Sequence, residues 1–197
     1  MIKKNPKKLP EHLRKRRLDL SAWLWHFVRR DANPNETLRN IIQDETIKGS
    51  IFRPFDEHVV CFTETPLFAH IQEDDDLKSW EYARLSLYGI GFPRDWLYEQ
   101  GARPVIYIES MYYDVLPDEL KYLFVEFDLG KKVDFSWQRE WRIKTNEFSV
   151  DRSKAILVFP DHNEFEDLIY DYYADFDISN GEVCPMVALI RNGISYR

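Results

Sequence analysis

Glycine and cysteine are scarce in this chain, and long apolar runs are missing. Its 197 residues include 7 glycines and 2 cysteines. Cys61 and Cys184 lie far apart and are flanked by apolar residues, which predicts buried reduced thiols rather than a disulfide framework. No apolar run approaches the roughly 20 residues that cross a bilayer, and the basic N-terminus leads into charged sequence rather than a signal-peptide core. We therefore expect a cytoplasmic protein that has no membrane segment.

Several signatures of nucleotide-binding proteins and hydrolases are also missing. The chain has no P-loop, and Gly89-x-Gly91 is not a dinucleotide fingerprint because the third glycine is absent and Pro93 follows. No serine stands in a Gly-x-Ser-x-Gly turn, which argues against a Ser-His-acid hydrolase. A P-loop enzyme, a Rossmann dehydrogenase and a serine hydrolase are therefore all disfavoured.

Metal-ligand spacing is weak throughout the chain. His58 and Cys61 are three residues apart, have no second close pair, and would face opposite sides of a strand. The acidic run at residues 73–76 lacks the glycine and the spacing of a calcium loop, and is typical of a solvated loop. We expect no metal site.

Short apolar runs and short amphipathic segments make up most of the sequence, which is 44% hydrophobic and 15% aromatic. The absence of regular strand–helix alternation predicts one α+β domain over residues 21–197. Strands are expected at residues 22–28, 58–63, 88–92, 104–108, around 138–143, 155–159 and 182–190. Helices are expected at residues 36–44 (with Gly49 closing the helix), 80–87, 95–100, 117–127 and 163–173.

Charge is distributed unevenly along the chain. Residues 1–17 carry eight basic side chains and one acid, so this segment has a charge of +7 while the whole chain has a charge of −7. We interpret residues 1–20 as a basic arm. Such an arm can neutralise the phosphates of nucleic acid, fold onto its own acidic domain, or dock an acidic partner. The sequence leaves these alternatives open.

The most distinctive motif is a Gln-x-Glu pair within the aromatic run from Phe135 to Ile143. On a strand, Gln138 and Glu140 would share one face, with Trp137, Trp141 and Ile143 on the opposite face. A fixed carboxylate beside a fixed amide suits chemistry on a sugar cation. The alternative is a glutamate at a strand edge that forms an ion pair with Arg139 or Arg142, and spacing alone favours this ion pair.

Two earlier segments place polar side chains in strands. His26 lies in the middle of the apolar run Trp25-His26-Phe27, and Thr63 and Thr65 flank Glu64 at the end of a second strand. Taken singly, each has a structural interpretation, as a core histidine bonded to backbone or as threonines that cap a turn. Together with Gln138-x-Glu140, and in this order, they indicate one site.

These segments resemble a known family. Leu24-Trp25-His26-Phe27, Leu38–Ile42, Ile47–Ser50, Val60–Pro66, Trp80–Ala83 through Tyr88–Phe92, and Glu140–Ile143 are similar to the AbiGi group of abortive-infection proteins and a related family of bacterial domains. The resemblance covers about residues 22–145. The same segments resemble the ADP-ribosyltransferase fold, including DarT-like toxins, which implies a mixed split β-sheet core with short helices.

The resemblance also implies roles in an NAD cleft. His26 would bind the adenine-side ribose, and Thr63 would supply the hydroxyl that supports the nicotinamide ribose and the catalytic strand. Thr65 would be a further cofactor-binding residue. Glu140 would bind the nicotinamide-ribose 2′-OH and stabilise the positive charge that grows as nicotinamide leaves. Gln138 would orient the acceptor.

Tyr82 and Tyr88 would be candidates to stack on nicotinamide, although Tyr88 also suits the core. Two departures from the family pattern stand out. The second motif reads Thr-Glu-Thr rather than Ser-Thr-Ser, which makes Glu64 a further candidate, and the first-strand histidine belongs to a different subgroup from the one in which Gln/Glu-x-Glu is usual.

The expected function is therefore a toxin-type ADP-ribosyltransferase that moves ADP-ribose from NAD to a macromolecule in phage defence. The basic arm tilts the expected acceptor toward RNA or DNA over protein, and an antitoxin protein is an expected partner. One rival is a non-enzymatic module that binds nucleic acid or a partner. Another is a metal-dependent nuclease that uses Glu64, Glu140 and the acidic run at 73–76.

Overall fold

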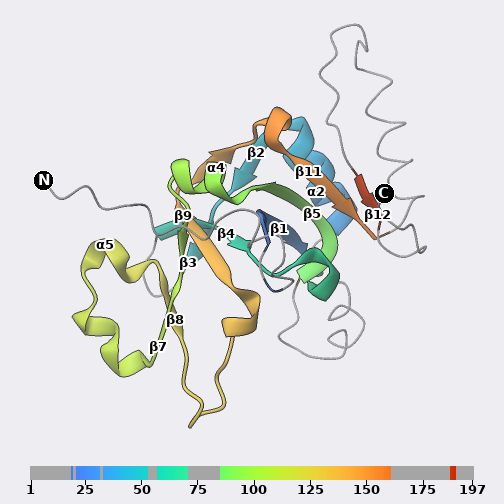
Figure 1. Ribbon diagram of the computed structural model, residues 1–197. Helices are drawn as coiled ribbons and strands as arrows, with labels where there is room; N and C mark the ends of the chain where they lie inside the picture. Colours follow the sequence, from blue (N-terminus) through green and yellow to red (C-terminus); the bar gives the residue numbers. More distant parts are fainter. Residues whose placement is uncertain are drawn as a thin grey trace, which may run out of the picture.

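The computed structural model describes residues 19, 21–31, 33–52, 57–70 and 85–160, and the backbone of 187–189. These residues form a mostly antiparallel sheet with a few short helices, which confirms the predicted α+β class (Figure 1). Residues 1–18, the acidic run at 73–76, Tyr82, the helix expected at 163–173 and Cys184 lie outside the described residues. Within the described part of the chain, no helix is long and apolar enough to span a bilayer.

The main sheet has the strand order β12-β11-β5-β1-β4-β9-β6, and β3 pairs with β4 beside this path. All of its pairs are antiparallel except β11 with β12. The strands are β1 (Trp23–Arg29), β3 (Ser50–Phe52), β4 (Glu57–Thr63), β5 (Leu85–Pro93), β6 (Arg103–Pro104), β9 (Glu140–Lys144), β11 (Ile156–Phe159) and β12 (Val187–Leu189). The strands expected at 22–28, 58–63, 88–92 and 155–159 are therefore confirmed to within a few residues.

The side chains of the sheet alternate between two apolar faces. One face carries alternate residues of β1, β4, β5, β9 and β11 and packs against helix α2 (Pro34–Gln43), which contributes Leu38, Ile41 and Ile42. Strands β2 (Thr46–Lys48) and β10 (Glu147–Ser149) pair with each other and cover the same face through Ile47 and Phe148. We call this the α2 face.

The opposite face buries Trp25, Phe27 and Val158. Glycine in β5 makes room for one of these rings, because a Cβ at Gly91 would lie 2.3 Å from the Trp25 ring. We call this the Trp25 face.

Along one edge, strand β4 pairs first with β3 and then with β1. His26 of β1 lies beside the part of β4 between these two pairings. The first residues of β4 pair with β3, from Glu57 to Val59, whereas its last residue pairs with β1 through Trp25 and Thr63. Between these two pairings, the His26 Nδ1–H donates to the Cys61 carbonyl oxygen at 2.8 Å. A side chain therefore satisfies a carbonyl that a continuous ladder would have bonded to backbone.

A small lobe projects beside the sheet (Figure 1). It contains β7 (Ile106–Ile108), the 3-10 helix η1 (Ser110–Val115), α5 (Asp118–Lys121) and β8 (Phe124–Glu126), with β7 and β8 parallel. Arg142 of β9 joins the lobe to the sheet, since its Nη1 donates to the carbonyl oxygens of Tyr122 and Phe124 at 2.7 and 3.0 Å.

Three predicted elements were wrong in part. The helix expected at 117–127 ends at Lys121, because Phe124–Glu126 pairs with β7 instead. Leu85–Leu87, expected to be helical, begin β5, where Leu87 is buried. The strand expected at 104–108 divides into β6 and β7 at Val105, whose N–H donates to the Glu140 carbonyl oxygen.

Gly49 does not close a helix, because α2 ends at Gln43. It lies between β2 and β3, where its N–H donates to the Asn146 carbonyl at 2.7 Å and a Cβ would lie 2.2 Å from the Thr145 carbonyl oxygen. The glycine is needed for this close backbone approach. The short helix expected at 95–100 is confirmed as α4 (Arg94–Glu99).

Candidate functional site

Gln138 and Glu140 do not lie on one strand, so the prediction that they share a strand face was wrong. Ser136–Gln138 form the 3-10 helix η2, Arg139 adopts the left-handed conformation with φ 46° and ψ 50°, and β9 begins at Glu140. The turn begins at Asp134, whose Oδ1 accepts from the Ser136 N–H at 2.8 Å and from the Ser136 hydroxyl at 2.6 Å. The alternation of side chains therefore starts two residues later than the sequence pattern suggested.

Thr63 and Thr65 fix this turn. The Thr63 hydroxyl donates to the Gln138 carbonyl and also accepts from the Thr65 N–H at 3.0 Å. The Thr65 hydroxyl donates to the Trp137 carbonyl at 2.8 Å, and the Glu64 N–H donates to the Arg139 carbonyl at 3.0 Å. Both threonines are buried. Their bonds hold η2 against the end of β4, so the structure places them behind the site as supports for its wall.

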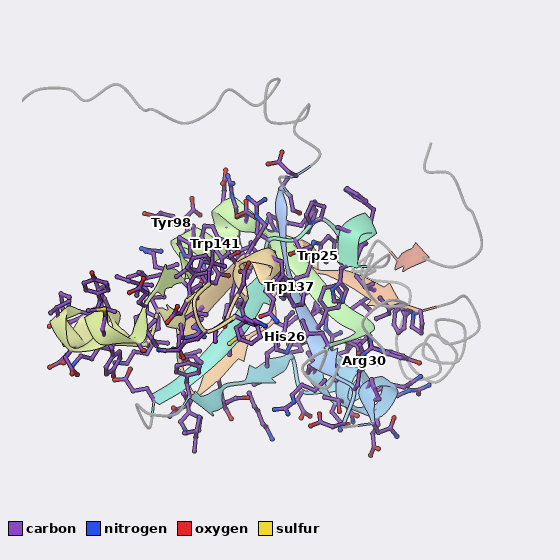
Figure 2. All side chains as sticks on the ribbon, turned by 90° about the horizontal axis from the view of Figure 1, so that it is seen from below. Trp25, His26, Arg30, Tyr98, Trp137 and Trp141 are labelled. Atoms are coloured by element: carbon purple, nitrogen blue, oxygen red, sulfur yellow. The ribbon has the colours of Figure 1, made fainter. Side chains whose placement is uncertain are left out.

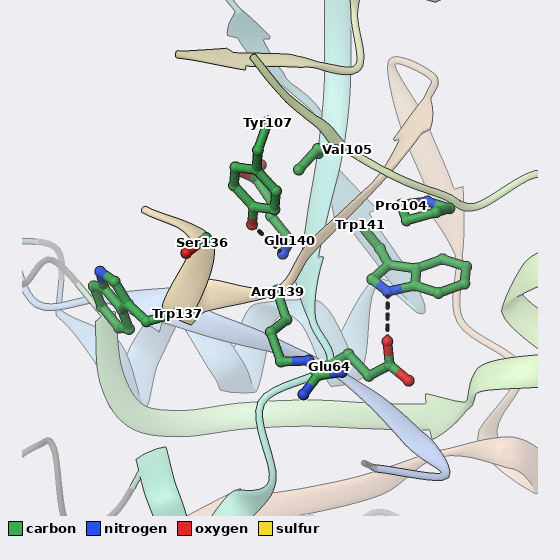
Figure 3. A pocket seen from close by; sticks show the side chains of 9 residues that line it. All are labelled: Glu64, Pro104, Val105, Tyr107, Ser136, Trp137, Arg139, Glu140 and Trp141. Atoms are coloured by element: carbon green, nitrogen blue, oxygen red, sulfur yellow. Dashed lines mark hydrogen bonds between the residues drawn. The ribbon is translucent and has the colours of Figure 1, made fainter. Parts of the chain in front are cut away.

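The start of β9 lies beside an open pocket of about 520 Å³ (Figure 3). The pocket combines three aromatic side chains, two carboxylates and one guanidinium, and its lining residues are Glu64, Pro104, Val105, Tyr107, Ser136, Trp137, Arg139, Glu140 and Trp141. In Figure 3 the indoles of Trp137 and Trp141 stand on two sides of Arg139. We call this the Glu140 pocket.

Glu140 is held firmly in this wall. Its Cα lies directly opposite that of Thr63 across the β4–β9 ladder. Its N–H donates to the Tyr107 hydroxyl at 2.9 Å, and its carboxylate receives Arg142 Nε at 2.7 Å and Nη2 at 3.2 Å. The ion pair that the sequence offered as an alternative role for Glu140 is therefore present, and its partner is Arg142.

Burial affects two uncharged ionisable groups beside Glu140, Tyr107 and Cys61. It raises the pKa of the Tyr107 hydroxyl, against the hydrogen bond from the Glu140 N–H. It also raises the pKa of the Cys61 thiol, which the negative charge of Glu140 raises further. Cys61 is a free, partly buried cysteine. Both groups therefore stay neutral at physiological pH.

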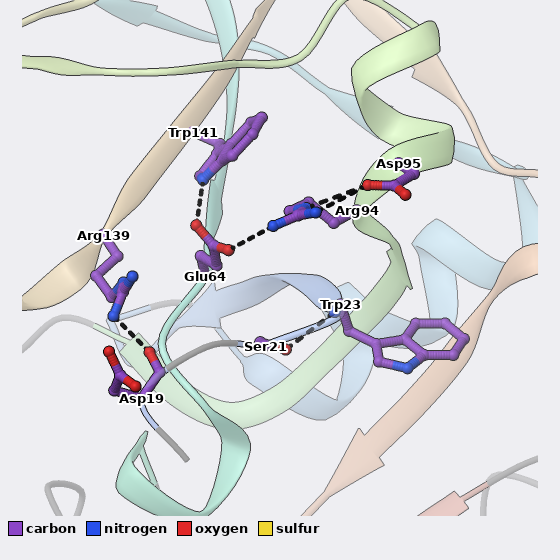
Figure 4. A network of polar contacts seen from close by, with 8 residues as sticks. All are labelled: Asp19, Ser21, Trp23, Glu64, Arg94, Asp95, Arg139 and Trp141. Carbon is purple, nitrogen blue, oxygen red and sulfur yellow. Dashed lines mark hydrogen bonds and ion pairs between the residues drawn. The ribbon is translucent and has the colours of Figure 1, made fainter. Parts of the chain in front are cut away.

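Glu64 forms the centre of a second polar network beside the pocket (Figure 4). Its Oε2 accepts from the Trp141 indole N–H at 3.2 Å, and its Oε1 pairs with Arg94 Nη1 at 3.2 Å. Arg94 also pairs with Asp95 at 2.9 Å, and Arg139 donates to the backbone carbonyl of Asp19. Burial raises the pKa of Glu64, against the Trp141 hydrogen bond and the charge of Arg139.

Trp141 also borders a second pocket, of about 460 Å³. Its other lining residues are Arg94, Asp95, Tyr98 and Glu99, all from or next to α4. Figure 2 shows Trp141 and Tyr98 beside each other, as their place around one pocket requires. The Trp141 indole thus belongs to both pockets and packs in part against the core.

His26 and Tyr88 do not join this site. Both belong to the α2 face, where His26 packs edge-on against Phe62 and Tyr88 packs against Phe159. Thr63 and Glu140 project from the Trp25 face, because Thr63 pairs directly with Trp25. The expectation that His26 lines one cleft with Thr63 and Glu140 was therefore wrong, and Tyr88 takes the core position that the sequence also allowed.

The sequence motifs did not identify four residues of the pocket wall as candidates for the site. Tyr107, Trp137, Arg139 and Trp141 line it. The prediction that Trp141 lies on the opposite face of the strand from Glu140 is confirmed, since Trp141 packs against the core of the α2 face. The Asp134-x-Ser136 pair was the available signal, because an aspartate two residues before a serine often starts a turn. Within the described part of the chain, no three His, Cys, Asp or Glu side chains lie close enough together to hold a metal ion.

Comparison of the chain with protein-family models, with curated proteins and with solved structures finds no match.

Proposed function

We propose that the protein is an NAD-dependent ADP-ribosyltransferase of toxin type, with Glu140 as the catalytic carboxylate of the Glu140 pocket. The observation that carries this proposal is that Glu140 is fixed in the wall of an aromatic-lined pocket, directly across the ladder from Thr63. The resemblance to DarT-like and AbiGi-like proteins supplies the reaction type, phage defence as the setting and the expected antitoxin partner.

The chemistry of the lining supports the proposal. The rings of Tyr107, Trp137 and Trp141 offer flat surfaces on which a nicotinamide or adenine ring can stack. The Arg139 guanidinium can pair with a diphosphate. A pocket of about 520 Å³ lies within the range of small-molecule sites.

Arg142 would serve catalysis by holding the Glu140 carboxylate in position. A carboxylate that is already fixed stabilises the positive charge that develops on the ribose as its bond to nicotinamide breaks, and needs no rearrangement during the reaction. Tyr107, bonded to the Glu140 backbone, would position the start of β9. Thr63 and Thr65 would contribute by holding η2, rather than by touching NAD.

The test is nicotinamide release from NAD, together with transfer of labelled ADP-ribose to components of a cell extract. Glu140→Gln should lower both rates by about 100-fold or more, as loss of a transition-state contact does. Glu57→Gln is the matched control, because Glu57 forms an ion pair with Lys144 on the same two strands but does not line the pocket. A wild-type protein that releases no nicotinamide with any extract would refute the activity. Equal rates for wild type and Glu140→Gln, in folded proteins, would refute the role of Glu140.

A non-enzymatic binding module is the second candidate, and the Glu140–Arg142 ion pair favours it because that pair has a structural role of its own. In that case the basic segment at residues 1–17 would bind nucleic acid or a partner. Deleting residues 1–17 separates the two candidates. The enzyme should still release nicotinamide, whereas the binding module should lose its ligand and show no turnover in either form.

A further inference from the structure

Two carboxylates line the Glu140 pocket, and they have different surroundings. Glu140 projects from β9 and pairs with a buried arginine. Glu64 follows the end of β4, is held by the Trp141 indole and by Arg94, and has a side chain that is 11% exposed. Two carboxylates in different environments at one pocket are the usual arrangement where one group stabilises charge and the other transfers a proton.

The structure also leaves one role of the proposed reaction unassigned. The family resemblance gave the acceptor-orienting role to Gln138, but Gln138 lies on η2, does not line the pocket, and uses its carbonyl to accept from Thr63. Glu64 lines the pocket in the motif where this chain departs from the family pattern. Its backbone N–H bonds to Arg139, so it is joined to the same turn that would have presented Gln138.

The groups that face Glu64 hold its carboxylate in place and favour its ionised form, which is the form that a general base needs. Arg94 from α4 forms an ion pair with it, and Arg94 also neutralises Asp95. Arg139 contributes positive charge from the start of β9, and Trp141 donates a hydrogen bond. Burial works against these groups and raises the Glu64 pKa toward the range where a carboxylate is an effective base. Each carboxylate oxygen can accept more than one hydrogen bond, so these contacts leave the carboxylate able to take a proton.

We propose that Glu64 is a second catalytic residue, the general base that takes the proton from the acceptor nucleophile. This inference rests on the proposed function. The bond between ribose C1′ and the nicotinamide nitrogen breaks, and its electron pair leaves with nicotinamide. The acceptor oxygen or nitrogen forms the new bond to C1′, and its proton passes to the Glu64 carboxylate. Glu140 stabilises the positive charge that develops on the ribose, and Trp141 and Arg94 position Glu64.

The test uses water as the acceptor and azide as a nucleophile that has no proton to lose. Glu64→Gln should lower NAD hydrolysis by about 100-fold, a typical contribution of a general base. Azide should restore nicotinamide release in Glu64→Gln and yield ADP-ribosyl azide. It should not restore Glu140→Gln, which lacks the group that helps nicotinamide to leave. A folded Glu64→Gln protein that hydrolyses NAD at the wild-type rate, or that azide does not restore, overturns the inference.

A second measurement needs no active variant. In the free wild-type protein, the indole N–H resonance of Trp141, assigned with Trp141→Phe, should shift as Glu64 takes up a proton, at a pH above the ordinary glutamate value of 4.5. As the pH is lowered through this range, the rate of NAD hydrolysis by the wild-type protein should fall, because protonated Glu64 is no longer a base. The rate of azide-dependent nicotinamide release by the same protein should stay constant. A resonance that is constant over this range, or an azide reaction that falls in parallel with hydrolysis, overturns the role of Glu64. A wild type that never releases nicotinamide refutes the proposed function, and the inference with it, whereas the outcomes above refute Glu64 alone.

Discussion

Arg142 and Glu140, two positions apart on β9, form an ion pair with two contacts, Nε to Oε1 at 2.7 Å and Nη2 to Oε2 at 3.2 Å. The Arg142 side chain is 3% exposed, and its guanidinium lies 3.9 Å from the centre of the Phe52 ring. Its third guanidinium nitrogen, Nη1, donates to the backbone carbonyls of Tyr122 and Phe124 in the β7–β8 lobe. One arginine therefore fixes the proposed catalytic carboxylate and attaches the lobe to the sheet.

Replacing this arginine should destabilise the fold strongly. Arg142→Gln leaves the Glu140 carboxylate without its charged partner and removes the donor to two lobe carbonyls, so we expect a loss of about 3 kcal/mol in the free energy of unfolding. Urea denaturation would measure it. Lys144→Gln is the control, because Lys144 lies on the same side of β9 but pairs with Glu57 near the surface, where such pairs contribute about 0–1 kcal/mol. Similar losses for the two variants would contradict the assignment.

The Thr63 hydroxyl should matter as a hydrogen-bonding group and not through its methyl group. Thr63→Val leaves the Gln138 carbonyl and the buried Thr65 N–H without their partner, which should cost about 1–3 kcal/mol. Thr63→Ser keeps the hydroxyl and should retain most of the stability. Urea denaturation of both variants tests this. If valine is tolerated as well as serine, the hydroxyl does not hold η2.

Close packing between β1 and β5 should make one glycine irreplaceable. In Gly91→Ala, the new Cβ would lie 2.3 Å from two atoms of the buried Trp25 ring, which should cost about 1–3 kcal/mol through overpacking. Gly130→Ala is the matched control, since its Cβ would meet only the end of the Asp128 side chain, at 3.1 Å. Thermal denaturation should show a clear drop in Tm for the first variant and little change for the second. A Tm that stays the same for Gly91→Ala would mean that Trp25 can move aside.

The sequence predicted four strands of the main sheet well because their apolar periodicity is strong and local. It placed β1, β4, β5 and β11 to within a few residues and found α4. Tertiary contacts decided what it missed. Phe124–Glu126 follow a proline and acidic residues that favour a helix, yet they pair with β7, where Val125 is buried. Local helix preference was overridden by a strand partner that is distant in sequence.

The site was harder to predict because one residue, Arg139, changes where the strand begins. Arg139 in the left-handed conformation separates Gln138 from β9, and hydrophobic alternation carries no signal of such a residue. The Asp-x-Ser sequence before the turn did carry a signal. Asp151 bonds to Ser153 in the same way that Asp134 bonds to Ser136, and each pair starts a 3-10 turn. The separation of His26 from Glu140 could not be read from the chain, since it depends on which residues of β1 and β4 face each other.

His26 should make stability depend on pH. Burial lowers its pKa below the ordinary value of 6.5, and the hydrogen bond to the Cys61 carbonyl opposes this only in part. The unfolded chain therefore binds a proton more readily than the folded one, so the stability present above about pH 6.5 is lost as the pH falls through that value. Tm should decline between pH 7.5 and 5 in the wild type. His26→Gln keeps an N–H donor for Cys61 but cannot take up a proton in this range, so its Tm should decline less steeply. Equal slopes for the two proteins would show that the folded protein accepts a proton at His26 as readily as the unfolded chain does.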